Sequence, residues 1–207
     1  MILKNSYWYF EKVLSDKFCN DIIKLALSKK DSLGVTGYLN PNEVEKSDDL
    51  KIQLFKKRNS NIVWLNEQWI YNELHNYVNI ANKNSGWNFD WDWSETLQFT
   101  IYKENQHYGW HTDSFEEPYK EGTEYGGKIR KISMTVSLTN PLEYEGGDFE
   151  IDCRNTEPGT ENKIICKEIK EKGSILLFPS HLWHRVHPVT KGTRYSLVMW
   201  SLGKPFK

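Results

Sequence analysis

The fold of this chain is decided by the stretch Ile132-Ser133-Met134-Thr135-Val136-Ser137-Leu138-Thr139. Apolar residues alternate there with small hydroxyl residues, so an extended segment would have one apolar face and one polar face. Residues 96–102 repeat the pattern, with Leu, Phe and Ile on one face and Thr, Gln and Tyr on the other. Both segments are therefore expected to be half-buried strands of a sheet.

Glycine and proline divide the rest of the C-terminal half into short segments. Gly146-Gly147 and Gly173 each precede a run that is rich in apolar residues, and Pro179 ends the second run. Further strands are expected at residues 148–153, 164–169, 174–178 and 193–201, with a loop at residues 154–163. Short strands at this spacing are typical of a double-sheet β fold.

The N-terminal half shows helical periodicity instead. Ser15 is placed to cap a helix whose apolar face carries Phe18, Ile22, Leu25 and Ala26. Asn66 is placed to cap a second helix, with an apolar stripe of Trp69, Ile70, Leu74, Tyr77, Val78 and Ala81. Residues 34–60, between the two helices, are polar and interrupted by Gly, Pro and Asp, so we expect a long loop there.

Helices followed by about eight short strands predict an α+β fold. The expected core is a double-stranded β-helix, or jelly roll, at residues 95–202, a fold that commonly holds a ligand or a metal between its sheets. Residues 1–94 would form a loop region and helices that pack on one sheet. A chain of 207 residues is expected to form one domain, covering residues 1–207.

Composition excludes several classes of protein. Aromatic residues make up 14% of the chain, which is too many for a disordered protein. The formal net charge of −1 disfavours nucleic acid as a partner, and the short basic cluster at residues 56–58 is interpreted as solvated. The three cysteines, Cys19, Cys153 and Cys166, form no close pair, and neither a signal peptide nor a membrane-spanning segment is apparent. We therefore expect a soluble cytoplasmic protein with no membrane partner.

His111 and Asp113 are candidate metal ligands. Residues i and i+2 of a strand point to the same face, so both side chains can reach one metal ion. Alone, this pair is weak evidence, because His-x-Asp often occurs by chance as a hydrogen-bonded pair. With a third ligand from a distant strand, the set becomes the two-histidine, one-carboxylate arrangement of non-haem Fe(II) oxygenases. Three protein ligands leave room for a 2-oxo acid, which chelates through two positions, and for O2.

Three histidines compete for the position of the third ligand, namely His181, His184 and His187. His184 is chosen because it alone stands ten residues before Arg194, the spacing found in such sites. The remaining histidines, His75, His107, His181 and His187, are expected to be ordinary and partly exposed, with His75 on the polar side of its helix.

Arg194 is the candidate anchor for the cosubstrate. The apolar residues 197–200 that follow it indicate a buried strand, and a buried guanidinium needs an anionic partner. The distal carboxylate of 2-oxoglutarate fits that need, because a guanidinium binds a carboxylate bidentately. Ser196 would share the face of Arg194, and Tyr102 could supply a further hydroxyl. The alternative is an ordinary arginine in a surface ion pair.

Across residues 95–202, the chain resembles the prolyl 4-hydroxylase branch of the Fe(II)/2-oxoglutarate dioxygenases. Tyr102 and Tyr108 stand nine and three residues before His111, as in that family, and Arg130 precedes the next core strand. Residues 138–149 resemble the family's hairpin with its Gly-Gly turn. Residues 184–194 resemble its distal-ligand strand, and Trp200 stands where the family places a tryptophan. A weaker similarity covers residues 58–65.

The resemblance implies a role for each of these positions. Fe(II) would bind His111, Asp113 and His184, which are the catalytic residues. The cosubstrate 2-oxoglutarate would contact Arg194, Tyr102 and Ser196, together with Ser133 or Thr135. The substrate would contact Tyr108, Arg130 and Trp200. Some collagen-type members have Lys in place of Arg194, and the extensions of secreted members are absent, so collagen-like substrates are not expected.

The implied reaction is hydroxylation of an unactivated C–H, most simply on a prolyl or other peptidyl side chain, with release of succinate and CO2. O2 is the oxidant, and ascorbate could serve as a reductant. A protein or peptide substrate is therefore expected. Two alternatives stay open, namely the same chemistry on a nucleobase or small metabolite, and a non-catalytic binding module that holds a metal. Residues 114–128, and also residues 34–60, are candidate lids.

Overall fold

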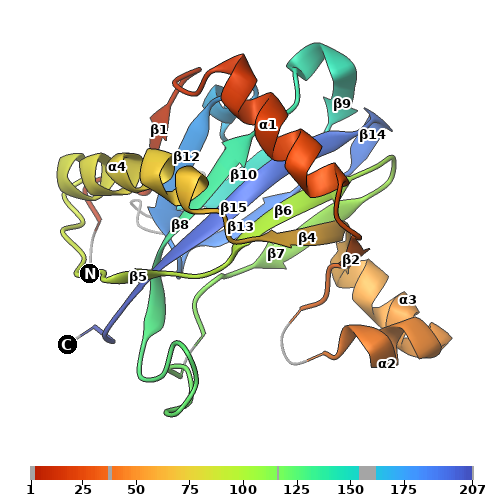
Figure 1. Cartoon of the computed structure of the whole chain (residues 1–207), viewed down its shortest axis with the longest axis horizontal. Helices are drawn as coiled ribbons and strands as arrows, with labels where there is room; N and C mark the ends of the chain where they lie inside the picture. Colours follow the sequence, from red (N-terminus) through yellow and green to blue (C-terminus); the bar gives the residue numbers. More distant parts are fainter. Residues whose placement is uncertain (1–2, 37–38, 116, 154–161, 207) are drawn as a thin grey trace.

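Two antiparallel sheets that face each other form the centre of the molecule in the computed structural model (Figure 1). The structure describes residues 3–36, 39–115, 117–153 and 162–206. The larger sheet contains, in spatial order, β1 (Trp8–Phe10), β12 (Ile175–Pro179), β8 (Ile129–Ser137), β15 (Arg194–Gly203), β6 (Leu97–Tyr102), β4 (Asn61–Leu65) and β2 (Ser32–Leu33), with β5 (Trp93–Ser94) paired to β15.

The smaller sheet closes the other side of the barrel. Its strands, in spatial order, are β11 (Lys163–Ile165), β10 (Phe149–Asp152), β13 (Trp183–Val186), β7 (His107–His111) and β3 (Arg58–Asn59). A separate ladder joins β14 (Val189–Gly192) to β9 (Tyr144–Gly146). Every strand pair in this set is antiparallel, and the predicted α+β jelly roll is confirmed.

Helices cover one face of the larger sheet. In Figure 1, α1 (Asp16–Leu27) and α4 (Gln68–Asn84) lie across that face, and their apolar residues join those of β6, β8 and β15 in one core. Two shorter helices, α2 (Pro41–Lys46) and α3 (Asp48–Lys57), project beside β2 and β3, and two 3-10 turns occur at Pro141–Glu143 and Lys167–Ile169. Among the described residues, no helix has the length and apolar character needed to span a membrane.

Strand β6 shows how the sequence pattern positions the site. The apolar side chains of β6 pack in the core shared with α1 and α4, as expected. Its polar side chains are also buried, because they face the interior between the two sheets rather than water. The polar residues that alternate along β6 therefore face an interior cavity, which Gln98 and Tyr102 line.

The three cysteines are buried and free. The cytoplasmic location stays a prediction from the sequence.

Several predictions about local structure need correction. Residues 34–60 contain α2, α3 and β3 rather than a continuous loop, because Val44 and Leu54 are buried and stabilise the helix pair. Residues 164–169 form the end of β11 and a 3-10 turn instead of one strand. Of the predicted loop at 154–163, residues 154–161 lie outside the described residues. The described part of the segment 95–202 contains ten strands rather than about eight, because β9, β11 and β14 are too short to show a pattern in the sequence.

The predicted caps of the two long helices differ in outcome. Ser15 caps α1 as expected, and its hydroxyl accepts a hydrogen bond from the backbone N–H of Phe18. Asn66 does not cap α4, because Glu67 occupies that position without a side-chain bond. The Asn66 side chain instead accepts a bond from the hydroxyl of Tyr71. The division of the chain into one domain with a boundary near residue 95 stays a prediction.

Candidate functional site

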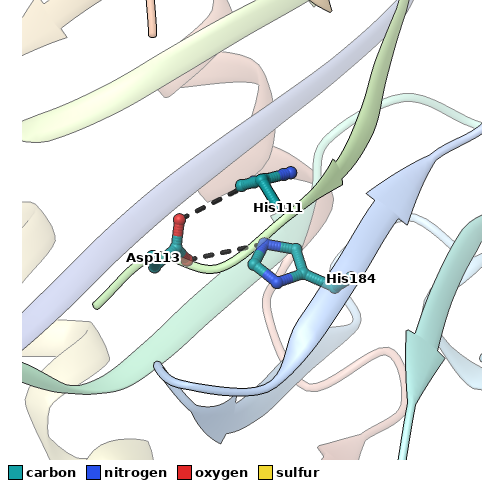
Figure 2. Close-up of side chains that lie close together, drawn as sticks. All are labelled: His111, Asp113 and His184. Carbon is teal, nitrogen blue, oxygen red and sulfur yellow. Dashed lines mark ion pairs between the residues drawn. The ribbon is translucent and has the colours of Figure 1, made fainter. Parts of the chain in front are cut away.

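The three predicted metal ligands lie together between the sheets. His111 ends β7, Asp113 follows two residues later, and His184 lies in β13, directly opposite His111 in the antiparallel ladder. Figure 2 shows both imidazole rings beside the carboxylate. Nε2 of His111 is 3.8 Å from Oδ1 of Asp113, and Nε2 of His184 is 3.6 Å from Oδ2. One ligand atom from each residue lies within 4.8 Å of the others, so the set could hold one metal ion.

The backbone orients both imidazole rings for metal binding. Nδ1 of His111 lies 2.8 Å from the carbonyl oxygen of Gly109, and Nδ1 of His184 lies 3.0 Å from that of Leu182. An Nδ1–H that donates to a carbonyl leaves the Nε2 lone pair free for a metal. Burial, followed by the nearby His184, holds the pKa of His111 well below its usual value. His111 is therefore neutral near pH 7, the form that a metal ligand requires.

Asp113 is held as a buried carboxylate. The Ser133 hydroxyl donates to its Oδ2 at 2.7 Å, and Ser180 lies 2.9 Å from the same hydroxyl. Burial alone would raise the pKa of Asp113, but the imidazoles of His184 and His111 outweigh it, and the pKa falls to about 2. The sequence predicts Ser133 as a contact of 2-oxoglutarate. In the structure its hydroxyl donates to Asp113 and orients the carboxylate, and a contact with 2-oxoglutarate stays a prediction.

A cavity leads from the three ligands to Arg194 at the start of β15. Arg194 is only 2% exposed, and its Nη1 atom is buried with no hydrogen-bond partner among the described residues. Such an orphaned donor costs free energy unless a ligand accepts from it. Its guanidinium lies beside the Tyr102 ring, and Tyr102, Thr135 and Ser196 line the same cavity. The residues present thus fit a dicarboxylic acid that binds a metal at one end and Arg194 at the other.

Gly147 makes room for the arginine. The backbone φ of Gly147 is +62°, and a Cβ added there would lie 3.0 Å from Cδ of Arg194. The Gly146-Gly147 pair does form the tight turn between β9 and β10 that the sequence indicates. The glycine pair therefore allows the tight turn and also leaves space for the Arg194 side chain.

A Gly147→Ala variant is expected to bind 2-oxoglutarate more weakly, because the new methyl group displaces Arg194. We expect the concentration of 2-oxoglutarate needed for half-maximal succinate formation to rise about tenfold, measured at saturating Fe(II). Gly86→Ala is the matched control, since Gly86 also has a positive φ, of +77°, but a Cβ there would meet only the Lys4 side chain, 3.9 Å away. Equal effects of the two variants would show that backbone strain alone is responsible.

Comparison with known proteins identifies the family. The model of the 2OG-Fe(II) oxygenase superfamily matches residues 97–202, just over half of the chain. The chain belongs to this superfamily. Oxygenases of this family use Fe(II), 2-oxoglutarate and O2, and the His-Asp-His group described above fits the iron site.

Individual relatives agree with this assignment. A PKHD-type hydroxylase of Alteromonas mediterranea is 38% identical over 103 residues, which are 49% of this chain and 41% of that protein. The oxygenase described here thus spans about two fifths of the length of the curated relatives it matches.

Two solved structures show the same fold. A viral collagen prolyl hydroxylase from Paramecium bursaria Chlorella virus-1, in a 2OG complex, aligns with a TM-score of 0.62 at 20% identity, covering 96% of this chain and 97% of that one. A Trichoplax adhaerens prolyl hydroxylase, in complex with a peptide fragment of hypoxia inducible factor, aligns with a TM-score of 0.60 at 16% identity, covering 95% and 83%. The predicted resemblance to prolyl hydroxylases is confirmed.

The rim of this oxygenase cavity contains aromatic side chains stacked on cations. The Tyr108 ring lies parallel to the His111 ring, with centroids 3.5 Å apart, and the guanidinium of Arg58 covers its other face at 4.6 Å. Arg58 is 4% exposed, and its Nη2 has no partner among the described residues. The interpretation of residues 56–58 as a solvated patch is therefore wrong for Arg58. The weaker family similarity at residues 58–65 was the one feature of the sequence that could have indicated a role for Arg58 near the site.

Arg130 and Trp200 form the opposite side of the rim. The Arg130 guanidinium lies 3.8 Å from the centre of the Trp200 ring, and its Nε and Nη2 each donate to a carboxylate oxygen of Glu95 at 2.6 Å. The hydroxyl of Tyr119, from the predicted lid, donates to the same carboxylate. Sequence reasoning missed Glu95, because nothing local marks an acid as the partner of a residue 35 positions later. The contact of Arg130 and Trp200 with substrate stays a prediction.

Glu95→Ala is expected to lower the free energy of unfolding by about 3 kcal/mol, because it leaves the Arg130 charge, whose side chain is only 14% exposed, without its partner. Chemical denaturation would measure this loss. The double variant Glu95→Ala/Arg130→Met removes both charges and should recover a large part of it. A double variant as unstable as the single one would argue that Glu95 acts through packing rather than through the ion pair.

The other histidines do not join the metal group. His187 lies 2.7 Å from a carboxylate oxygen of Glu150, and His181 is exposed beside Phe206. His75 is partly exposed, as expected, and its Nε2 lies 3.0 Å from the hydroxyl of Ser94. Among the described residues, His111, Asp113 and His184 form the single group suited to a metal ion.

Proposed function

We propose that this chain is an Fe(II)- and 2-oxoglutarate-dependent dioxygenase that hydroxylates an unactivated C–H bond of a prolyl or other peptidyl side chain. One observation carries the proposal. Two imidazoles and a carboxylate converge within 4.8 Å, in a cavity that also contains the unpartnered, buried guanidinium nitrogen of Arg194. A metal site that served only structure would have no use for that arginine.

Each residue has a defined task in this proposal. His111, Asp113 and His184 hold Fe(II) on one face and leave its other positions open. Arg194 binds the distal carboxylate of 2-oxoglutarate, while Tyr102, Ser196 and Thr135 line its path. When bound, Fe(II) and 2-oxoglutarate supply O2 activation, in which the oxo acid becomes succinate and CO2 and a C–H becomes C–OH. Ser133 keeps Asp113 oriented and ionised.

A peptide is the proposed substrate class. The curated relatives are PKHD-type hydroxylases, and the two solved structures of similar fold are prolyl hydroxylases, one of them with a peptide fragment bound. Tyr108 and Trp200 line the cavity, and we expect the edge of the Tyr108 ring and the indole of Trp200 to contact a prolyl ring, with the Arg130 guanidinium beside Trp200. A small metabolite is the alternative substrate class that the measurements below distinguish.

Two measurements test the proposal. Anaerobic addition of Fe(II) and 2-oxoglutarate should give a weak visible charge-transfer band, and a protein without this band would be a metal-holding module. Incubation with an array of proline-containing peptides should then give products heavier by one oxygen, in step with succinate. Succinate formation that no peptide increases, but that a metabolite mixture does, would reject the peptide substrate and keep the oxygenase chemistry.

A further inference from the structure

A second concave surface lies outside the iron cavity. It is a groove of about 500 Å³ between the start of α4, the edge strand β5 and the loop after Asp113. Its lining residues include Tyr71, His75, Trp91, Trp93, Thr96 and Glu124. We call this the aromatic groove. Trp93 is 48% exposed, so a large apolar side chain is presented to solvent there.

The aromatic groove continues the lining of the iron cavity. Gln98 of β6 lines the cavity, and Trp64 is its partner on β4, so both side chains lie on the same side of the sheet. Trp64 is 46% exposed, and its ring lies 6.5 Å from that of Trp200, which also lines the cavity. Thr96 lies just before β6 and Asn66 just after β4, each two residues from this pair in the chain, and both line the groove. An extended peptide leaving the cavity would therefore pass Trp64 and reach the groove.

An unpartnered donor lies on this route. Nε1 of Trp200 is buried and has no hydrogen-bond partner among the described residues. An indole N–H in that position needs an acceptor, and the carbonyl oxygen of a peptide can supply one. This observation is independent of the charges in the groove and favours a peptide backbone beside Trp200.

The charge of the groove points to the chemistry of its occupant. Asp92 pairs with Lys128, Glu67 with Lys29, and Glu95 with Arg130. No ion pair involving Glu124 occurs among the described residues, so this groove-lining residue adds a negative charge that no neighbouring cation compensates. His75 adds no opposing charge, because burial lowers its pKa and the ring is neutral near pH 7. A carboxylate in the same groove as the exposed indole ring of Trp93 is the combination that binds an ammonium or guanidinium group.

We propose that the aromatic groove is a specificity subsite for a lysine or arginine of the peptide substrate. The proposal rests on the peptide hydroxylase function given above. Gln98 and Ser94, which mark the cavity and the groove, are four residues apart in the chain. At about 3.3 Å per residue, the basic side chain would stand roughly four residues from the hydroxylated one. The basic side chain would lie between the Trp93 ring and the Glu124 carboxylate.

Matched peptides test this proposal. Fluorescently labelled peptides carry one proline and, four residues away on either side, Lys, Gln or Glu, and their binding is followed by anisotropy in the presence of Fe(II) and 2-oxoglutarate without O2. The wild-type protein should bind the Lys peptide about threefold more tightly than the Gln peptide. Glu124→Gln should remove that difference, and Glu124→Lys should reverse it in favour of the Glu peptide. Glu121→Gln is the control, since Glu121 lies in the same loop but does not line the groove.

The outcomes separate this proposal from the proposed function. With O2 present, loss of Glu124 should raise KM for the Lys peptide and leave kcat unchanged. Peptide hydroxylation with no difference between Lys and Gln peptides, or an equal effect of Glu121→Gln, would overturn the subsite and leave the hydroxylase intact. A Glu124-dependent preference in binding, without any oxygen transfer to peptides, would instead support the subsite and reject the peptide hydroxylase reaction.

Discussion

Replacing His184 by alanine is expected to lower succinate formation more than about 100-fold, because even the outer partners of metal ligands contribute 10–100-fold. His184 is buried between Phe149 and Phe178, and its Nε2 faces Asp113. Two ligands from His111 and Asp113 cannot hold Fe(II) in a facial arrangement by themselves. Isothermal titration with Fe(II) under anaerobic conditions should show the loss of binding directly.

His187→Ala is the control for this experiment. His187 lies three residues later on the opposite side of the strand and contacts Glu150 rather than the metal group. Its removal should leave iron affinity and turnover within about twofold of the wild type. If His184→Ala kept full iron affinity, or His187→Ala lost it, the assignment of the third ligand would be wrong.

The second large effect is expected for Arg194→Met. Charge-assisted hydrogen bonds to a carboxylate contribute about 1.5–3 kcal/mol, so the 2-oxoglutarate requirement should rise at least tenfold. Iron affinity should be unchanged, because Arg194 is not among the three residues that surround the metal position. Titrating 2-oxoglutarate against succinate formation, at fixed saturating Fe(II), measures the change.

Thermal unfolding distinguishes this role from a structural one. In the wild type, the buried Nη1 of Arg194 has no partner among the described residues, so 2-oxoglutarate with a metal should raise Tm. The Arg194→Met protein should show no such rise and should be no less stable without ligand. Arg185→Met is the control, because Arg185 pairs with Glu150 outside the cavity. A variant that loses stability but keeps its response to 2-oxoglutarate would contradict the assignment.

Local patterns predicted those features that depend on neighbours in the chain. Ser15 caps α1, and residues 132–137 of the alternating stretch lie in β8, because both features depend on backbone geometry within a few residues. The same reasoning failed at Asn66, where the side chain bonds Tyr71 instead of the helix end. It also failed at residues 34–60, because the α2–α3 pair is stabilised by burial of Val44 and Leu54.

The candidate site divides in the same way. Spacing, the apolar strand around Arg194 and the family resemblance together marked His111, Asp113, His184 and Arg194, and the structure brings the first three together. The sequence could not indicate that the Arg58 guanidinium would cover the Tyr108 ring, nor that Glu95 would bind Arg130. A surface charge and a buried charge look the same in a sequence, since the difference lies in neighbours from distant segments.

What the sequence determined by itself is the choice of chemistry: two imidazoles, a carboxylate and a guanidinium, carried on strands whose period of two turns them inward. What only the tertiary structure decided is which further polar groups lose water and must find partners, as Glu95 does with Arg130 and as Ser133 does with Asp113. The free energy of a buried polar group depends on the atoms that replace its water, and those atoms come from strands far apart in the chain.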